Sequence, residues 1–185
     1  MKKLAIALLA SVAFSTAAFA GVIHFENTGP NSYNGEPSYQ YYGTHDGKPA
    51  TFMCLNDNLY ISYGETWFAD PKPVTTDMEA EQAWLFQRAG DGSNSDYQGA
   101  VWYLGNNSTS LTPGAATLVS DAETYVASLN GNYSQFKDIA IWTPTTDHTG
   151  WTNGEPQSFM TTTPEPASLL LLGSGVIAFW RKIVA

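Results

Sequence analysis

Apolar and polar positions alternate in several short stretches of the chain, between two almost uninterrupted apolar runs at residues 4–14 and 167–180. Short alternating segments bounded by Gly, Pro, Asn and Asp predict β-strands. These segments are residues 21–26, 39–43, 50–55, 59–68, 138–143 and 157–161. The Asp46-Gly47 pair predicts a tight hairpin between the second and third of them.

The middle of the chain has helical spacing instead. Thr76 and Glu79 form a capping-box pattern, which predicts a helix that ends at Gly90. A second helix is predicted over residues 96–104, and Thr112-Pro113 is typical of the start of a third. The order of strands, three helices and strands predicts an α+β fold: a mostly antiparallel β-sheet or barrel with a three-helix insert.

The first twenty residues predict a secretory signal peptide. Lys2-Lys3 is followed by an apolar run that is too short to span a bilayer stably. The small residues Ala18 and Ala20 form the Ala-x-Ala pattern that a signal peptidase cuts, so we expect an N-terminal signal helix removed after Ala20.

The last residues show a second pattern that is typical of a targeting signal. Pro164-Glu165-Pro166 disfavours helix, and the apolar segment 167–180 after it is shorter than a standard transmembrane helix. Trp180 and the basic pair Arg181-Lys182 suit a membrane interface with positive charge inside. We therefore expect a C-terminal hydrophobic helix that holds the protein at the inner membrane for a time.

This tail closely resembles the PEP-CTERM sorting signal of exported proteins in Gram-negative bacteria that make exopolysaccharide. The resemblance rests on Pro164-Glu165-Pro166, the apolar segment and Arg181-Lys182. It implies that the partners are an exosortase, a membrane transpeptidase, and the secretion machinery, and that the protein ends in the cell envelope or on the extracellular surface. The chain then divides into a signal peptide (1–20), a mature extracytoplasmic domain (21–163) and a sorting signal (164–185).

The composition limits the classes of binding partner and of site chemistry that we expect for this chain. The chain has 8 Lys+Arg against 17 Asp+Glu, a net charge of −9, which argues against binding to nucleic acid. The single cysteine excludes an intramolecular disulfide, and with three scattered histidines it gives no pattern for a zinc site. The sequence shows no nucleophile–base set, so we expect a non-enzymatic protein without metal or cofactor, and His45 and His148 in solvent-facing loops.

The lone Cys54 has three interpretations: an inert buried side chain, an intermolecular disulfide, or a reactive thiol. Phe52-Met53-Cys54-Leu55-Asn56-Asp57 and Tyr97-Gln98-Gly99-Ala100-Val101-Trp102 together resemble the thioester domains of bacterial surface adhesins. The resemblance implies that Cys54 and Gln98 condense, with loss of ammonia, into a thioester that a surface amine opens. Gln87 is the competing partner on the first helix.

Two functions follow from these patterns. The first is an exported cell-surface or exopolysaccharide-matrix protein that takes part in adhesion and biofilm through a Cys54–Gln98 thioester. The alternative is a non-covalent structural or glycan-binding β-rich module with an inert buried cysteine. Aromatic side chains that could stack on sugars, or simply pack on a strand face, are Tyr39, Tyr41, Tyr42 and Trp151.

Overall fold

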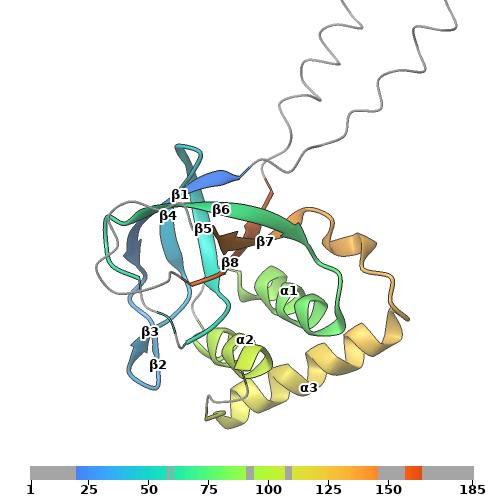
Figure 1. The fold of residues 1–185 in the computed structure, drawn as a ribbon. Coiled ribbons are helices and arrows are strands. Elements are labelled where there is room, and N and C mark those ends of the chain that lie inside the picture. The colour runs from blue at the N-terminus through green and yellow to red at the C-terminus, as the bar shows by residue number, and fades with distance from the viewer. Residues whose placement is uncertain are drawn as a thin grey trace, which may run out of the picture.

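Six antiparallel strands close into a barrel in the order β1-β4-β5-β8-β7-β6 (Figure 1). The computed structural model describes residues 20–57, 59, 61–90, 94–106, 110–145 and 157–163. The barrel strands are β1 (Gly21–Thr28), β4 (Tyr41–His45), β5 (Lys48–Cys54), β6 (Thr66–Pro73), β7 (Ile139–Pro144) and β8 (Phe159–Thr162). A separate small hairpin joins β2 (Ser32–Tyr33) to β3 (Glu36–Pro37).

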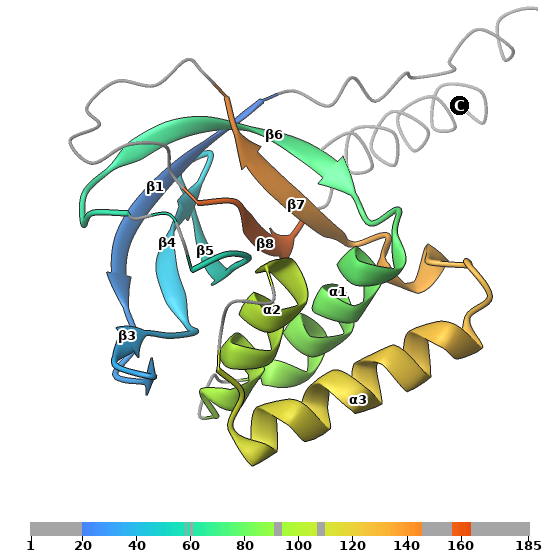
Figure 2. The same cartoon turned by 60° about the horizontal axis from the view of Figure 1, so that its bottom comes forward.

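Three helices lie between β6 and β7 in the sequence. They are α1 (Asp77–Ala89), α2 (Asp96–Asn106) and α3 (Pro113–Ser128), and a 3₁₀ turn, η1 (Ser134–Phe136), follows. The helices pack on one another, and α2 also contacts β5 of the barrel. Figure 2 shows them gathered together beside the barrel. The predicted α+β fold, a barrel with a three-helix insert, is confirmed.

The capping box predicted at the start of α1 is present. The side chain of Thr76 accepts a hydrogen bond from Glu79 N, and the Glu79 carboxylate accepts from Thr76 N at 3.0 Å and Thr75 N at 2.8 Å. Burial raises the pKa of Glu79, but the ion pair with Lys72 and the Thr75 donors outweigh it and lower the pKa overall. This ionised carboxylate ties the first turn of the insert to the end of β6.

Strand β6 differs from its prediction. The sequence predicts a strand over residues 59–68, whereas β6 begins at Thr66 and extends to Pro73. Gly64 has a φ of 83°, a turn conformation that glycine adopts without strain and that precedes the strand. Proline is uncommon inside a sheet because it lacks the N–H donor. Pro71 and Pro73 lie beyond Ala69, the last residue of β6 that pairs with β1. This half of β6 is therefore bordered by β7.

Aromatic side chains fill the barrel. Phe159 lies among Phe52, Trp67 and Tyr41, with ring centroids 5.7 to 5.9 Å away. Tyr39 is buried as well, so the strand-packing interpretation of these tyrosines holds and the sugar-stacking one does not. Tyr42 is half-buried, and Trp151 lies outside the described residues.

The solvent-facing position predicted for His45 is wrong. The side chain is 4% exposed, and its ring lies against Trp142 with centroids 4.1 Å apart. Burial lowers its pKa, so His45 is a neutral packing residue beside the hairpin rather than a surface group. His148 lies outside the described residues.

Most of the two predicted targeting segments also lies outside the described residues, which begin at Ala20 and end at residue 163. Ala20 is exposed and directly precedes β1. Within the described part of the chain, no helix is long and apolar enough to cross a membrane.

Gly43 provides a test of the barrel. A Cβ at this position would lie 2.0 Å from the backbone oxygen of His24 on β1, so Gly43→Ala should force the two strands apart. We expect a loss of about 2 kcal/mol in the free energy of unfolding, measured in urea. Gly29→Ala is the matched control, because its Cβ would meet its nearest atom at an ordinary 3.5 Å. Equal stability of the two variants would contradict the observed β1–β4 packing.

Candidate functional site

Cys54, the chain's single cysteine, lies where three elements meet. It is the last residue of β5, it pairs with Phe159 at the start of β8, and α2 packs against the same strand. The side chain is 0% exposed. Pairing with the neighbouring strand β8 and packing of α2 on β5 therefore remove the thiol from solvent completely.

Two carbonyl oxygens face the sulfur. Cys54 Sγ lies 2.7 Å from the backbone oxygen of Asn56 and 2.5 Å from Gln157 Oε1, so a thiol hydrogen has two acceptors. Burial raises the pKa of the Cys54 thiol to about 12, opposed by smaller contributions from the Trp102 side chain and the backbone at Asn56. The sulfur is thus a neutral thiol at neutral pH, held directly against a side-chain amide.

The structure places Gln98 against the backbone of Cys54, although 44 positions separate the two residues in the sequence. Gln98 is 0% exposed in the first turn of α2, and its Nε2 donates to the backbone oxygen of Cys54 at 2.6 Å. Its Oε1 is buried without a hydrogen-bond partner among the described residues. The observed contact is therefore with the backbone of Cys54, and the competing Gln87 is exposed on α1.

Gln157 is the residue that sequence reasoning missed. It is 8% exposed, and its amide lies between the Cys54 sulfur and the backbone oxygen of Leu59, which accepts from its Nε2. The available signal was its place at the start of the strand predicted over residues 157–161, whereas the observed strand begins at Phe159. Gln157 reaches Cys54 only because β5 pairs with β8. The two residues are 103 positions apart, so no local sequence pattern indicates their contact.

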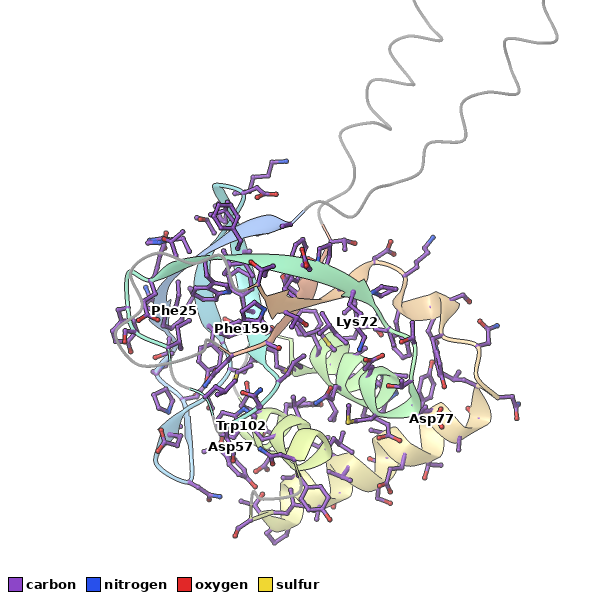
Figure 3. All side chains as sticks on the ribbon, in the orientation of Figure 1. Phe25, Asp57, Lys72, Asp77, Trp102 and Phe159 are labelled. Atoms are coloured by element: carbon purple, nitrogen blue, oxygen red, sulfur yellow. The ribbon has the colours of Figure 1, made fainter. Side chains whose placement is uncertain are left out.

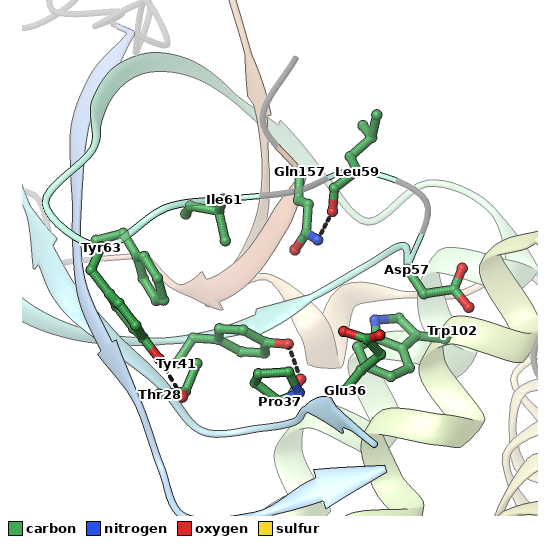
Figure 4. Close-up of a pocket in the computed structure, with 11 residues that line it drawn as sticks. Thr28, Glu36, Pro37, Tyr41, Asp57, Leu59, Ile61, Tyr63, Trp102 and Gln157 are labelled. Carbon is green, nitrogen blue, oxygen red and sulfur yellow. Dashed lines mark hydrogen bonds between the residues drawn. The ribbon is translucent and has the colours of Figure 1, made fainter. Parts of the chain in front are cut away.

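A hollow of about 240 Å³ opens beside this cluster (Figure 4). Gln157 and Trp102 form part of its wall, so it leads from solvent toward the groups that contact the sulfur. The remaining lining is largely apolar with two carboxylates: Phe25, Thr28, Glu36, Pro37, Tyr41, Asp57, Leu59, Ile61 and Tyr63. Figure 3 places Phe25, Asp57 and Trp102 on one side of the molecule, and Lys72 and Asp77 on the other.

The hollow lies at the barrel end opposite the points where the chain enters and leaves. The β4–β5 hairpin adjoins the start of β1, because Asp46 N donates to Val22 O at 2.8 Å. Cys54 ends the strand that begins at Lys48, so at about 3.3 Å per residue it lies roughly 20 Å from that hairpin. Strand β8 runs from Cys54 back toward the first end, so the start of β1 and the end of β8 lie at the same end of the barrel in Figures 1 and 2.

The described residues contain no group of three or more His, Cys, Asp or Glu side chains that could hold a metal ion. The site contains one thiol, two glutamine amides, the carboxylates of Glu36 and Asp57 in the hollow, and the surrounding aromatic side chains.

Replacing Gln98 tests its structural contribution. Gln98→Leu removes the hydrogen bond to the Cys54 backbone and leaves that buried oxygen without its donor. We expect the free energy of unfolding to fall by about 1–3 kcal/mol, measured by urea denaturation. Gln87→Leu, on an exposed position of α1, is the control and should change little. A Gln98→Leu protein as stable as wild type would argue against the buried contact.

Comparison with known proteins assigns the tail of the chain. Residues 162–183 match the family model described as the PEP-CTERM protein-sorting motif, which confirms the predicted sorting signal. No curated protein and no solved structure matches the chain, so the barrel is assigned from its own geometry. The chain is an exported protein directed to the cell envelope, and its PEP-CTERM motif marks it for processing by an exosortase at the membrane.

Proposed function

We propose that the barrel is a non-enzymatic adhesive domain that carries an internal thioester between Cys54 and a buried glutamine. It would act at the cell surface or in the exopolysaccharide matrix. One observation carries the proposal: the completely buried Cys54 sulfur lies 2.5 Å from the side-chain carbonyl oxygen of Gln157. A nucleophile and an acyl group in contact, with water excluded, are what thioester formation requires.

The chemistry needs no co-reactant. The thiol loses its proton, the sulfur attacks the amide carbonyl carbon, the carbon–nitrogen bond breaks, and the nitrogen leaves as ammonia with the proton. In the reverse sense, an amine on a partner attacks the acyl carbon, the carbon–sulfur bond breaks, and the sulfur recovers a proton. The second step leaves a stable amide between this protein and its partner, which is covalent adhesion.

Gln157 is the better-placed acyl donor, and Gln98 is the alternative that the sequence resemblance favours. The carbonyl of Gln157 contacts the sulfur, whereas Gln98 uses its amide nitrogen to hold the backbone of Cys54. Gln98 still has a buried carbonyl oxygen beside the site, without a partner among the described residues, so both pairs belong to the proposal. Substitution of each glutamine separates them.

The surroundings of the site suit an external amine. The hollow carries the carboxylates of Glu36 and Asp57 on a largely apolar wall, and opposite charge attracts a cationic side chain such as lysine. Its position at the barrel end away from the start of β1 and the end of β8 would direct the hollow outward from a protein held through its tail.

The second candidate is a non-covalent glycan-binding or structural module, and one observation favours it. Phe25 and Tyr63 stack with ring centroids 5.4 Å apart at the hollow, and Tyr63 is 65% exposed. An exposed aromatic face is a common platform for a sugar ring. In this case Cys54 is inert, in keeping with the raised pKa of its thiol.

Intact-mass measurement of the mature domain decides between the two functions. We expect a mass about 17 Da below that of the unmodified sequence, the mass of ammonia, and full mass in Cys54→Ala. Gln157→Ala should also restore full mass apart from the substitution, while Gln98→Leu and the control Gln87→Leu should keep the deficit. Loss of the deficit in Gln98→Leu but not in Gln157→Ala would assign the bond to Gln98. Full mass of the wild type with one titratable thiol would contradict the thioester and support the non-covalent module.

Processing of the tail is testable by cell fractionation. Replacing Pro164-Glu165-Pro166 with three alanines should keep the full-length protein in the inner membrane, because the exosortase then lacks its motif. Removal of Val184-Ala185, which lie beyond the matched residues 162–183, is the control and should leave sorting unchanged. Identical distribution of the alanine variant and wild type would contradict recognition at this sequence.

A further inference from the structure

We infer that the indole N–H of Trp102 is the anion-stabilising donor of this site, which holds the Cys54 sulfur as a thiolate while the thioester forms and opens. This inference rests on the proposed thioester and adds a catalytic residue to it. The observation behind it is a buried donor, without a partner among the described residues, in the wall of the hollow that Gln157 also lines.

The position of this buried donor distinguishes it from the other described indole nitrogens. Trp102 is 3% exposed, and its Nε1 has no hydrogen-bond partner in the described part of the chain. A buried N–H without a partner costs free energy, so its retention calls for an explanation. The described indole nitrogens of Trp67, Trp84 and Trp142 are unpaired too, but Trp102 alone of the four lines the hollow shared with Gln157 (Figure 4).

The sulfur needs such a donor when it carries charge. The hydrogen-bond acceptors at Sγ are the oxygens of Asn56 and Gln157, which accept from a thiol but repel a thiolate. Asp57 also disfavours the thiolate, and the hydroxyl of Tyr41 donates to Pro37 O at 2.6 Å instead. The Trp102 side chain acts in the opposite direction and lowers the pKa of the thiol against the larger effect of burial.

Packing against Tyr33 holds the Trp102 ring in place. Its ring meets Tyr33 edge-on, with centroids 6.3 Å apart and an interplanar angle of 76°. The Tyr33 hydroxyl donates to Ser110 O and accepts from Thr112 N, both at 2.9 Å. Gly99 leaves room for the Tyr33 ring, because a Cβ there would lie 2.1 Å from it. A rigid donor of this kind stabilises developing charge without reorganising during the reaction.

In the opening step, the N–H of Trp102 stabilises the sulfur as it leaves. The amine nitrogen bonds to the acyl carbon, the carbon–sulfur bond breaks, and the sulfur leaves with the bonding electron pair. The Trp102 N–H donates to this thiolate until the proton released by the amine reaches the sulfur. Charge-assisted hydrogen bonds of this kind are about twice as strong as neutral ones.

The test measures the rate at which methylamine opens the thioester of the mature domain, followed by intact mass. Trp102→Phe removes the donor, and incorporation of β-(3-benzothienyl)alanine at position 102 removes the N–H while keeping the shape of the indole. Trp84→Phe is the matched control, because that indole nitrogen is also buried and unpaired among the described residues but does not line the hollow. We expect both changes at position 102 to slow opening by about tenfold or more, and the control to change it less than about twofold.

The outcomes separate this inference from the proposed function. A wild-type mass without the deficit of about 17 Da overturns the thioester, and the role of Trp102 with it. A deficit that is present, with opening as fast in the benzothienyl variant as in wild type, overturns the role of Trp102 alone. Slow opening in Trp102→Phe with normal opening in the benzothienyl variant also overturns that role, since the side chain then acts only by packing.

Discussion

The burial of one thiol against side-chain amides is the constraint on which the proposed chemistry depends. Cys54 has no exposed surface, and the acceptors at its sulfur are the carbonyl oxygens of Asn56 and Gln157. In water a thioester hydrolyses and a thiol is freely oxidised. Here the protein excludes water and keeps the sulfur next to a side-chain amide, the reaction partner that the proposal requires.

The architecture explains how this contact arises from distant segments. Antiparallel pairing of β5 with β8 brings Gln157 to Cys54, and the packing of α2 on β5 brings Gln98 and Trp102 from the helical insert. Closure of the barrel pairs the strand edges that an open sheet would leave exposed. The site therefore requires the barrel and the insert together, and neither part would form it alone.

Local patterns predicted much of this structure. Most of the barrel strands, the capping box at Thr76 and the three helices could be predicted, because each depends on nearby residues or on a short motif. Burial of His45 and the contact of Gln157 with the sulfur could not. Both depend on which strands become neighbours when the barrel closes, and pairing over 103 residues leaves no periodicity in the sequence. The proline-containing half of β6 escaped prediction for a related reason, because its tolerance of proline depends on which strands border it.

The sorting motif and the barrel together describe a protein that is exported and then, in the proposed account, presents its chemistry away from its tail. Peptide mapping under acidic conditions without added amine tests the central claim most directly, since it identifies the two residues that share the bond. The account predicts a cross-linked species that joins the peptide containing Cys54 to the peptide containing Gln157 and separates on treatment with methylamine. Recovery of both peptides unlinked, with an unmodified Cys54 thiol and glutamine at position 157, would contradict it.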